Sequence, residues 1–219
     1  MRLPFADRAE AGRLLADRLA SLDLRAPIVL ALPRGGVPVG YEVARRLSTP
    51  GDTAAFDVLV TRKIGYPYQP ELGVGAIAEG GEPVLDSPLL DRLELREHDL
   101  AATVNRERAE MDRRIAVYRD QRPLPDPAGR PVIVVDDGLA TGGTARAALR
   151  AVRKRRPSRL ILAVPVGAAE TASAMREEAD DVVVLAEPRR FRAVGQWYMQ
   201  FDQLTDDDVL RWLERAGVK

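Results

Sequence analysis

The 219-residue sequence contains no cysteine and only one histidine, His98. The lack of cysteine excludes a disulfide framework, a thiol nucleophile and a cysteine-ligated metal site. His98 has no second histidine, aspartate or cysteine at a metal-ligand spacing, so we expect a solvated side chain and not a zinc ligand.

The sequence also has no excess of charge of either sign, because 33 Lys and Arg residues balance 33 Asp and Glu residues. Without a positive field over the whole molecule, we expect neither nucleic acid nor a membrane as a partner, and a bound anion must be held by a local site. Long hydrophobic runs are missing as well. Charged residues interrupt the segment from Met1 to Leu22 every few positions, which favours a cytoplasmic protein without a signal peptide.

The remaining composition is typical of a folded globular protein. Hydrophobic residues make up 46% and charged residues 30%, and the 16 prolines and 17 glycines are scattered along the chain. A chain of this length fits one sizeable α/β domain. We expect a single domain over residues 1–219, with a core of about 27–185, a helical insertion of about 88–122 and a hood with the C-terminal part at about 186–219.

Five short apolar runs predict strands, and helical patterns separate the later ones. The runs cover residues 27–32, 56–60, 132–135, 160–166 and 182–185, and the helical patterns cover 145–155 and 170–179. This alternation predicts an α/β fold with a doubly wound, mainly parallel five-stranded sheet. An amphipathic helix over residues 6–22 should cover the sheet or a partner, and we expect no chemistry from it.

The stretch between the second and third predicted strands is an insertion on this core. Residues 65–81 are rich in Gly, Pro and Tyr and predict a loop, and one long charged helix should follow over about 88–119. Its apolar residues recur at spacings of three, four and seven. They predict a seam against the body or, alternatively, a homodimer contact, formed by Leu93, Leu100, Val104, Met111, Ile115 and Tyr118.

The segment 132–144, Val-Ile-Val-Val-Asp-Asp-Gly-Leu-Ala-Thr-Gly-Gly-Thr, carries the strongest functional signal. It places the carboxylates of Asp136 and Asp137 at a strand end, before a loop of small residues that opens a helix. Backbone N–H groups in such a loop can surround a phosphate at the positive end of the helix. Two neighbouring carboxylates near a buried sheet edge require a cation or hydroxyl donors, which a vicinal diol supplies directly or through Mg²⁺. A ribose 5-phosphate has both the diol and the phosphate.

This string resembles the phosphoribosyl pyrophosphate signature of the type I phosphoribosyltransferases, and it departs from that signature at Gly138, where the family more often has an apolar residue. The resemblance implies that Asp136 and Asp137 hold the ribose hydroxyls and contact Mg²⁺ through substrate or water. It also implies phosphoribosyl pyrophosphate and a small acceptor as partners. The 5′-phosphate would be held by Ala140, Thr141, Gly142, Gly143 and Thr144.

Two further loops should reach the same edge of the sheet, because ligands of such folds bind beyond the carboxyl ends of the strands. By the resemblance, the pyrophosphate loop is formed by Arg34, Gly35 and Gly36. Arg62 and Lys63 would add positive charge at the start of a flexible loop over 65–81 that closes on the reacting centre. Glu71 in this loop is a candidate proton-handling residue, with a solvated carboxylate as the alternative.

The acceptor would be chosen by the hood, where Phe191, Trp197 or Tyr198 could stack on a planar base. The alternative is that these aromatic rings only cover the edge of the core. Ala140 stands where the hypoxanthine and guanine members carry an acidic residue, so the loop is more similar to that of the adenine members. The sequence thus predicts a Mg²⁺-dependent phosphoribosyltransferase of nucleotide metabolism with an unidentified acceptor. A phosphoribosyl-sensing regulator without turnover, and a sugar-phosphate hydrolase that uses the same pocket, remain alternatives.

Overall fold

The computed structural model describes residues 3–120 and 122–218. Its centre is a five-stranded sheet in the order β2-β1-β6-β7-β8, and every neighbouring pair is parallel. The strands are β1 (Ile28–Ala31), β2 (Ala55–Val58), β6 (Pro131–Val135), β7 (Arg159–Val166) and β8 (Asp181–Ala186). The predicted five-stranded parallel sheet is therefore confirmed.

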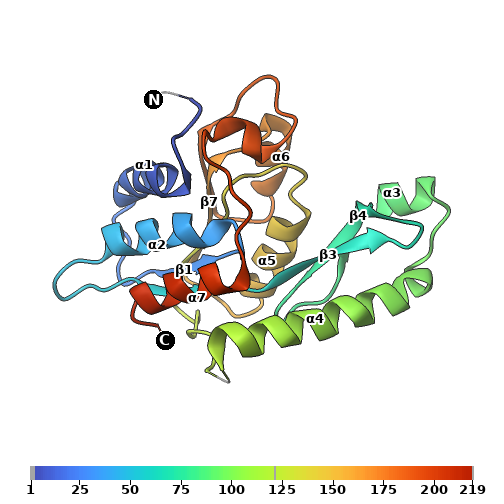
Figure 1. The fold of residues 1–219 in the computed structure, drawn as a ribbon. Coiled ribbons are helices and arrows are strands. Elements are labelled where there is room, and N and C mark those ends of the chain that lie inside the picture. Colours follow the sequence, from blue (N-terminus) through green and yellow to red (C-terminus); the bar gives the residue numbers. More distant parts are fainter. Residues whose placement is uncertain (1–2, 121, 219) are drawn as a thin grey trace.

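Helices cover both faces of this sheet (Figure 1). Successive strand residues point to opposite faces, so Val29 and Ile133 lie in one hydrophobic cluster, and Leu30 and Val134 lie in another. The first cluster is closed by α1 (Arg8–Ala20), α2 (Gly36–Leu47) and α7 (Asp206–Arg215). The second is closed by α5 (Gly143–Arg153) and α6 (Ala169–Met175). This is the doubly wound arrangement that the alternation of strands and helices predicts.

A second, antiparallel sheet stands beside the first and was not predicted. It contains β3 (Thr61–Tyr66), β4 (Gln69–Ala78) and β5 (Val84–Leu85), and it forms the arm that projects from the body in Figure 1. The prediction of a loop over 65–81 was thus wrong. Glycine and proline dominate the composition of this stretch, but Val74, Ala76, Ile77 and Ala78 are all buried, and a short apolar run of this kind is consistent with a buried strand.

The predicted continuous helix over 88–119 is interrupted. The structure has α3 (Ser87–Arg92), a 3₁₀ turn η1 (Glu97–Leu100) and α4 (Ala101–Arg119). Glu94 has a positive φ of 53°, which an α-helix does not accommodate. The N–H of Arg96 then donates to the Asp99 carboxylate at 2.8 Å, and this bond caps the next turn. The chain therefore bends between the end of α3, before Glu94, and the start of the next turn at Arg96.

The apolar seam of the insertion packs within the chain. Leu100 and Tyr118 are fully buried and Met111 is 5% exposed, and all three belong to the cluster that contains Ile64 and Val74. These three residues belong to the seam for which the sequence allowed either packing against the body or a homodimer contact. The end of α4 is anchored by Arg119, whose side chain is 2% exposed, forms an ion pair with Glu79 and donates to the Val58 carbonyl oxygen at 3.1 Å.

The hood is built from both ends of the chain. The N–H of Phe5 donates to the Trp197 carbonyl at 2.8 Å, and the N–H of Met199 donates to the Phe5 carbonyl at 2.7 Å. Phe5 and Tyr198 are buried together with Val166. The segment before α1 therefore lies over the carboxyl end of the parallel sheet together with residues 191–202. No helix in the part of the chain that the structure describes is both long and apolar enough to cross a membrane.

Candidate functional site

The carboxylates of Asp136 and Asp137 follow directly after β6, at the carboxyl edge of the parallel sheet. The Asp136 carboxylate accepts a hydrogen bond from the N–H of Asp137 at 2.8 Å. Burial, and then the charge of Asp137, raise the pKa of Asp136 well above its usual range. Burial also raises the pKa of Asp137, although the charge of Arg8 opposes this shift. The pair therefore favours any ligand that supplies positive charge or hydroxyl donors.

The loop between β1 and α2 crosses the end of β6 at very short range. A Cβ added to Gly35 would lie 2.0 Å from the Asp137 Oδ2 atom, and one added to Gly36 would lie 2.6 Å from the Val135 carbonyl oxygen. Only glycine fits at both positions, because neither the strand backbone nor the occluded carboxylate can withdraw cheaply. The structure thus brings the predicted Arg34-Gly35-Gly36 loop against the carboxylate pair.

The small-residue loop after the carboxylates turns back into α5. Gly142 has a φ of 76°, which favours glycine, and its carbonyl accepts the first helical bond from the N–H of Arg146 at 2.8 Å. The Ala140 carbonyl is fixed by the Thr171 hydroxyl at 2.7 Å. A Cβ on Gly143 would meet no atom within 4 Å. The N-terminus of α5 consequently opens onto free space, which suits an anion.

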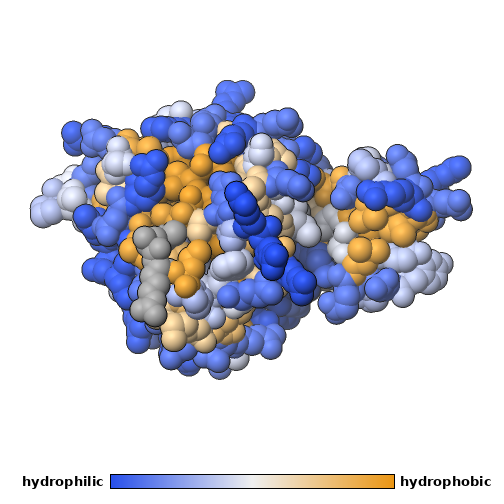
Figure 2. Space-filling view, turned by 90° about the horizontal axis from the view of Figure 1, so that it is seen from above, coloured by the Kyte–Doolittle hydropathy of each residue, from blue (hydrophilic) through white to orange (hydrophobic). Residues whose placement is uncertain are grey.

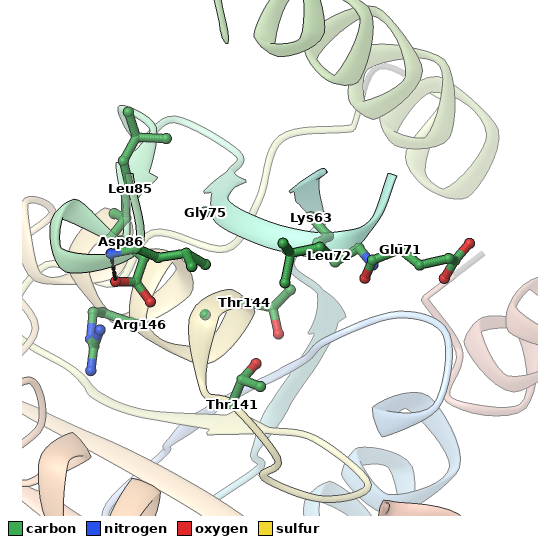
Figure 3. Close-up of a pocket in the computed structure, with 13 residues that line it drawn as sticks. Lys63, Glu71, Leu72, Gly75, Leu85, Asp86, Thr141, Thr144 and Arg146 are labelled. Carbon is green, nitrogen blue, oxygen red and sulfur yellow. Dashed lines mark hydrogen bonds between the residues drawn. The ribbon is translucent and has the colours of Figure 1, made fainter. Parts of the chain in front are cut away.

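That space is a cavity of about 540 Å³ between the loop and the antiparallel sheet (Figure 3). Thr141 and Thr144 line one side of it, and Lys63 and Glu71 line the other, where the Lys63 ammonium donates to the Glu71 carbonyl oxygen at 2.8 Å. The view from above in Figure 2 shows hydrophobic surface on the arm as well as on the body. The apolar part of the cavity wall comes from the antiparallel sheet and from α3, and consists of Leu72, Val84, Leu85 and Leu89.

The two predicted basic residues of β3 separate. Lys63 faces the cavity, whereas Arg62 forms an ion pair with Glu107 of α4 at 2.7 Å, because neighbouring side chains on a strand point to opposite faces. Arg34 lies within electrostatic reach of Tyr118 of α4, where its charge counteracts the raised pKa of the phenol. Lys63 therefore lines the cavity directly, while the Arg62 side chain is directed to α4.

The hood lies directly on the carboxylate segment. The Tyr198 hydroxyl donates to the Asp137 carbonyl oxygen at 2.5 Å, and burial with the nearby Asp137 charge raises the pKa of this phenol, so it stays protonated. Phe191 and Trp197 stack on each other, with ring centroids 6.4 Å apart and planes inclined by 23°. The Trp197 indole N–H is buried without a hydrogen-bond partner in the described ranges 3–120 and 122–218. These rings therefore contribute first to the packing of the hood itself.

Three charged side chains at the site were not predicted. Arg8 at the start of α1 pairs with Asp137, although no chemistry was expected from this helix. Arg146 and Asp86 line the cavity. Arg146 lies one turn into α5 beyond the signature, a spacing that could have indicated it, whereas nothing in the sequence connects Arg8 with a residue 129 positions away.

A family model described as "Phosphoribosyl transferase domain" matches residues 6–202. The chain belongs to this family. The resemblance inferred from the signature is thereby confirmed, and the match to this phosphoribosyl transferase domain includes residues 191–202 of the hood but begins one residue after Phe5.

Individual relatives agree with this assignment. A Mycobacterium tuberculosis H37Rv protein named "Putative phosphoribosyl transferase Rv0571c" is 44% identical over 212 residues, which are 97% of this chain and 47% of that protein. The chain thus spans about half of this relative's length. The crystal structure of TT1426 from Thermus thermophilus is 44% identical, covers 98% of this chain and 99% of its own, and superposes with a TM-score of 0.80. A uracil phosphoribosyltransferase of Lactobacillus gasseri is 39% identical over 82 residues, which are 33% of this chain and 39% of that enzyme.

Proposed function

We propose that this domain transfers a 5-phosphoribosyl group from phosphoribosyl pyrophosphate to a nitrogen of a small acceptor and releases pyrophosphate. The observation that carries the proposal is the buried pair Asp136 and Asp137, followed within a few residues by a small-residue loop that opens a helix onto a cavity. A phosphate and a vicinal diol on one sugar match these two features in the same order.

In this assignment the 5′-phosphate binds to the loop 140–144 and the ribose lies over the carboxylates. The N–H groups at the start of α5 and the hydroxyls of Thr141 and Thr144 donate to the phosphate. Gly143 leaves the space that a phosphate needs, since a Cβ there would meet nothing within 4 Å. As the bond from ribose C1 to the pyrophosphate oxygen breaks, positive charge develops on the sugar, and the neighbouring carboxylates stabilise it.

The leaving pyrophosphate is assigned to the glycine loop and the basic residues around it. Gly35 and Gly36 allow backbone approach beside Asp137, and Arg34 carries a positive charge in the same loop. Lys63 faces the cavity and adds the positive charge of its ammonium group, and Arg62 can join only by leaving Glu107. Glu71 lines the same cavity and is the candidate for receiving the acceptor proton.

The residues fit Mg²⁺ as a cation that is held mainly by the substrate. No group of three or more carboxylate or histidine side chains that could hold a metal occurs in the portion of the chain that the structure describes. One or two carboxylates together with substrate phosphates are, however, the usual way in which Mg²⁺ is bound. Asp136 and Asp137 would hold it through the substrate or through water, and the ion would neutralise the diphosphate.

For the acceptor we propose a planar nitrogenous base. The Ala140 loop resembles that of the adenine members, and the local similarity to a uracil phosphoribosyltransferase adds a pyrimidine to the set worth testing. Phe191 and Trp197 offer aromatic surface in the hood, although their faces already contact each other. The acceptor panel should therefore contain adenine, hypoxanthine, guanine and uracil.

The test is calorimetric titration with phosphoribosyl pyrophosphate, with and without Mg²⁺, followed by pyrophosphate release with each base. We expect Mg²⁺-dependent binding that is lost in the Asp136→Asn, Asp137→Asn variant. The matched control is Asp180→Asn, Asp181→Asn, which removes two adjacent carboxylates at the amino end of β8, where they pair with Arg153 and Arg159. No donor binding by the parent protein would refute the proposal. Binding without turnover would indicate a sensor, and release of ribose 5-phosphate together with pyrophosphate, without dependence on any base, would indicate a hydrolase.

A further inference from the structure

Arg8 is the cation that contacts the carboxylate pair in this structure. Its Nε atom donates to Asp137 Oδ2 at 2.8 Å, and the two side chains are only 11% and 13% exposed. The pair joins the start of α1 to the end of β6. A charge-assisted hydrogen bond of this kind, shielded from water, is stronger than an ion pair on the surface.

The hood holds the same guanidinium from the other side. Its NH1 group donates to the Asp202 carbonyl oxygen at 3.0 Å, and its central carbon lies 3.8 Å from the centroid of the Phe201 ring. The Phe201 ring stacks on Tyr198 at 5.1 Å, and Tyr198 itself bonds to the Asp137 backbone. One arginine therefore connects the hood to the carboxylate that is expected to receive the ribose.

This contact leaves little of Asp137 for a ligand. Its Oδ2 atom is bonded to Arg8 and lies so close to Gly35 that a Cβ there would be 2.0 Å away. A hydroxyl or a hydrated cation that approaches Oδ2 would thus have to replace the guanidinium. Arg8 would keep its contacts with Asp202 and Phe201 after leaving Asp137, so its release from the carboxylate does not leave the charge unpartnered.

We propose that Arg8 is a positioning residue of the donor site, which holds Asp137 and the hood together in the unliganded protein and is displaced from Asp137 when the diol of the donor binds. This inference rests on the proposed function, because it takes phosphoribosyl pyrophosphate as the ligand. The donor and Arg8 then compete for the Asp137 carboxylate, so the measured donor affinity depends on how much more strongly the carboxylate binds the donor than it binds Arg8. Displacement of Arg8 removes one of the two bonds between the hood and Asp137, the other being the Tyr198 bond to the Asp137 carbonyl, so loosening of the hood is coupled to donor binding.

The test compares the parent protein with Arg8→Ala, Arg8→Gln and the control Arg13→Ala. Arg13 also lies on α1 but pairs with Glu42 at 3.7 Å, away from the carboxylates. Affinity for phosphoribosyl pyrophosphate with Mg²⁺ is measured by calorimetry, and hydrogen exchange is followed at the backbone amides of residues 198–202. Arg8→Gln removes the charge but keeps a polar side chain, and serves if Arg8→Ala does not fold.

We expect the neutral variants to bind the donor about fivefold or more tightly, the low end of typical coupling between sites, and to exchange faster in the hood without any ligand. The parent should reach similarly fast exchange when the donor is added, and Arg13→Ala should behave like the parent. A purely structural role for Arg8 would weaken donor binding instead. Unchanged or weaker affinity in the Arg8 variants, with a parent that binds, would overturn this inference alone. A parent that does not bind the donor would overturn the proposed function with it.

Discussion

The side chain of Val194 occupies the position in which a Cβ on Gly138 would lie, with the nearest methyl 2.5 Å from that point. Gly138 is the residue at which the signature departs from its family pattern, and the hood contains the apolar group that fills this space. The glycine at this position of the signature and the docking of the hood therefore belong together, because Gly138 leaves the space that Val194 fills.

Gly138→Ala should consequently destabilise the protein, because the added methyl overpacks a filled site. Overpacking of this kind typically costs about 1–3 kcal/mol. Combining it with Val194→Ala should recover most of the loss, and urea unfolding of the two single variants and the double variant measures the coupling. Additive effects in this cycle would show that the two residues do not meet in solution.

Two glycines of the site should respond in opposite ways to the same substitution. Gly143→Ala meets open space at the first residue of α5, so the fold should be unchanged or more stable by about 0.4–1 kcal/mol, while donor binding weakens because the methyl enters the phosphate space. Gly36→Ala should lower stability strongly, since its Cβ would lie 2.6 Å from a strand carbonyl. Melting temperatures and calorimetric titrations of both variants check this. Equal losses of stability would contradict the assigned geometry.

Asp136→Asn should raise the melting temperature at neutral pH. The folded-state pKa of Asp136 is raised by burial and by Asp137, so the ionised carboxylate opposes folding. This penalty is absent below about pH 4, where the group is protonated in both states, and grows as the pH rises toward the folded-state pKa. The difference in melting temperature between variant and parent should therefore be close to zero at low pH and widen with pH. A gap that narrows on raising the pH would contradict this sign.

Arg119→Ala should be among the most damaging substitutions away from the site. It removes one partner of a buried ion pair and leaves Glu79 uncompensated, which typically costs about 3–5 kcal/mol. The Val58 carbonyl loses its donor as well. Arg176→Ala, at the exposed residue that follows α6, is the control and should have no measurable effect. Chemical denaturation of both variants would show whether α4 is anchored through this pair.

The parts of the molecule that were predictable are those with local signals. Neighbouring residues determine the strand runs, the loop 138–144 and the helix after it. Both the parallel sheet and the family could therefore be predicted from the sequence. The antiparallel sheet was missed because Gly65, Pro67 and Pro70 suggested a loop. The apolar residues Val74, Ala76, Ile77 and Ala78 were the competing signal, and burial of Ala76 and Ala78 against α5 favoured the strand.

No local sequence signal predicted the contacts made by Arg8. They depend on how the N-terminal segment pairs with residues 197–199, and long-range pairing of this kind is not encoded in periodicity or spacing. The same holds for Arg62 and Lys63, which are adjacent in sequence but lie on different sides of β3. The two basic residues predict positive charge near the site, and the alternation of side chains along the strand determines which of the two supplies it.

The antiparallel sheet rests on α5 through small side chains, Ala76 and Ala78 on the sheet and Ala147 and Ala151 on the helix. The helix that follows the loop 138–142 thus supports the opposite wall of the cavity. Methyl groups in this interface determine how closely the sheet approaches the helix. A single larger side chain at Ala147 would push the sheet away from the helix and widen the cavity without any substitution in the segment 132–144.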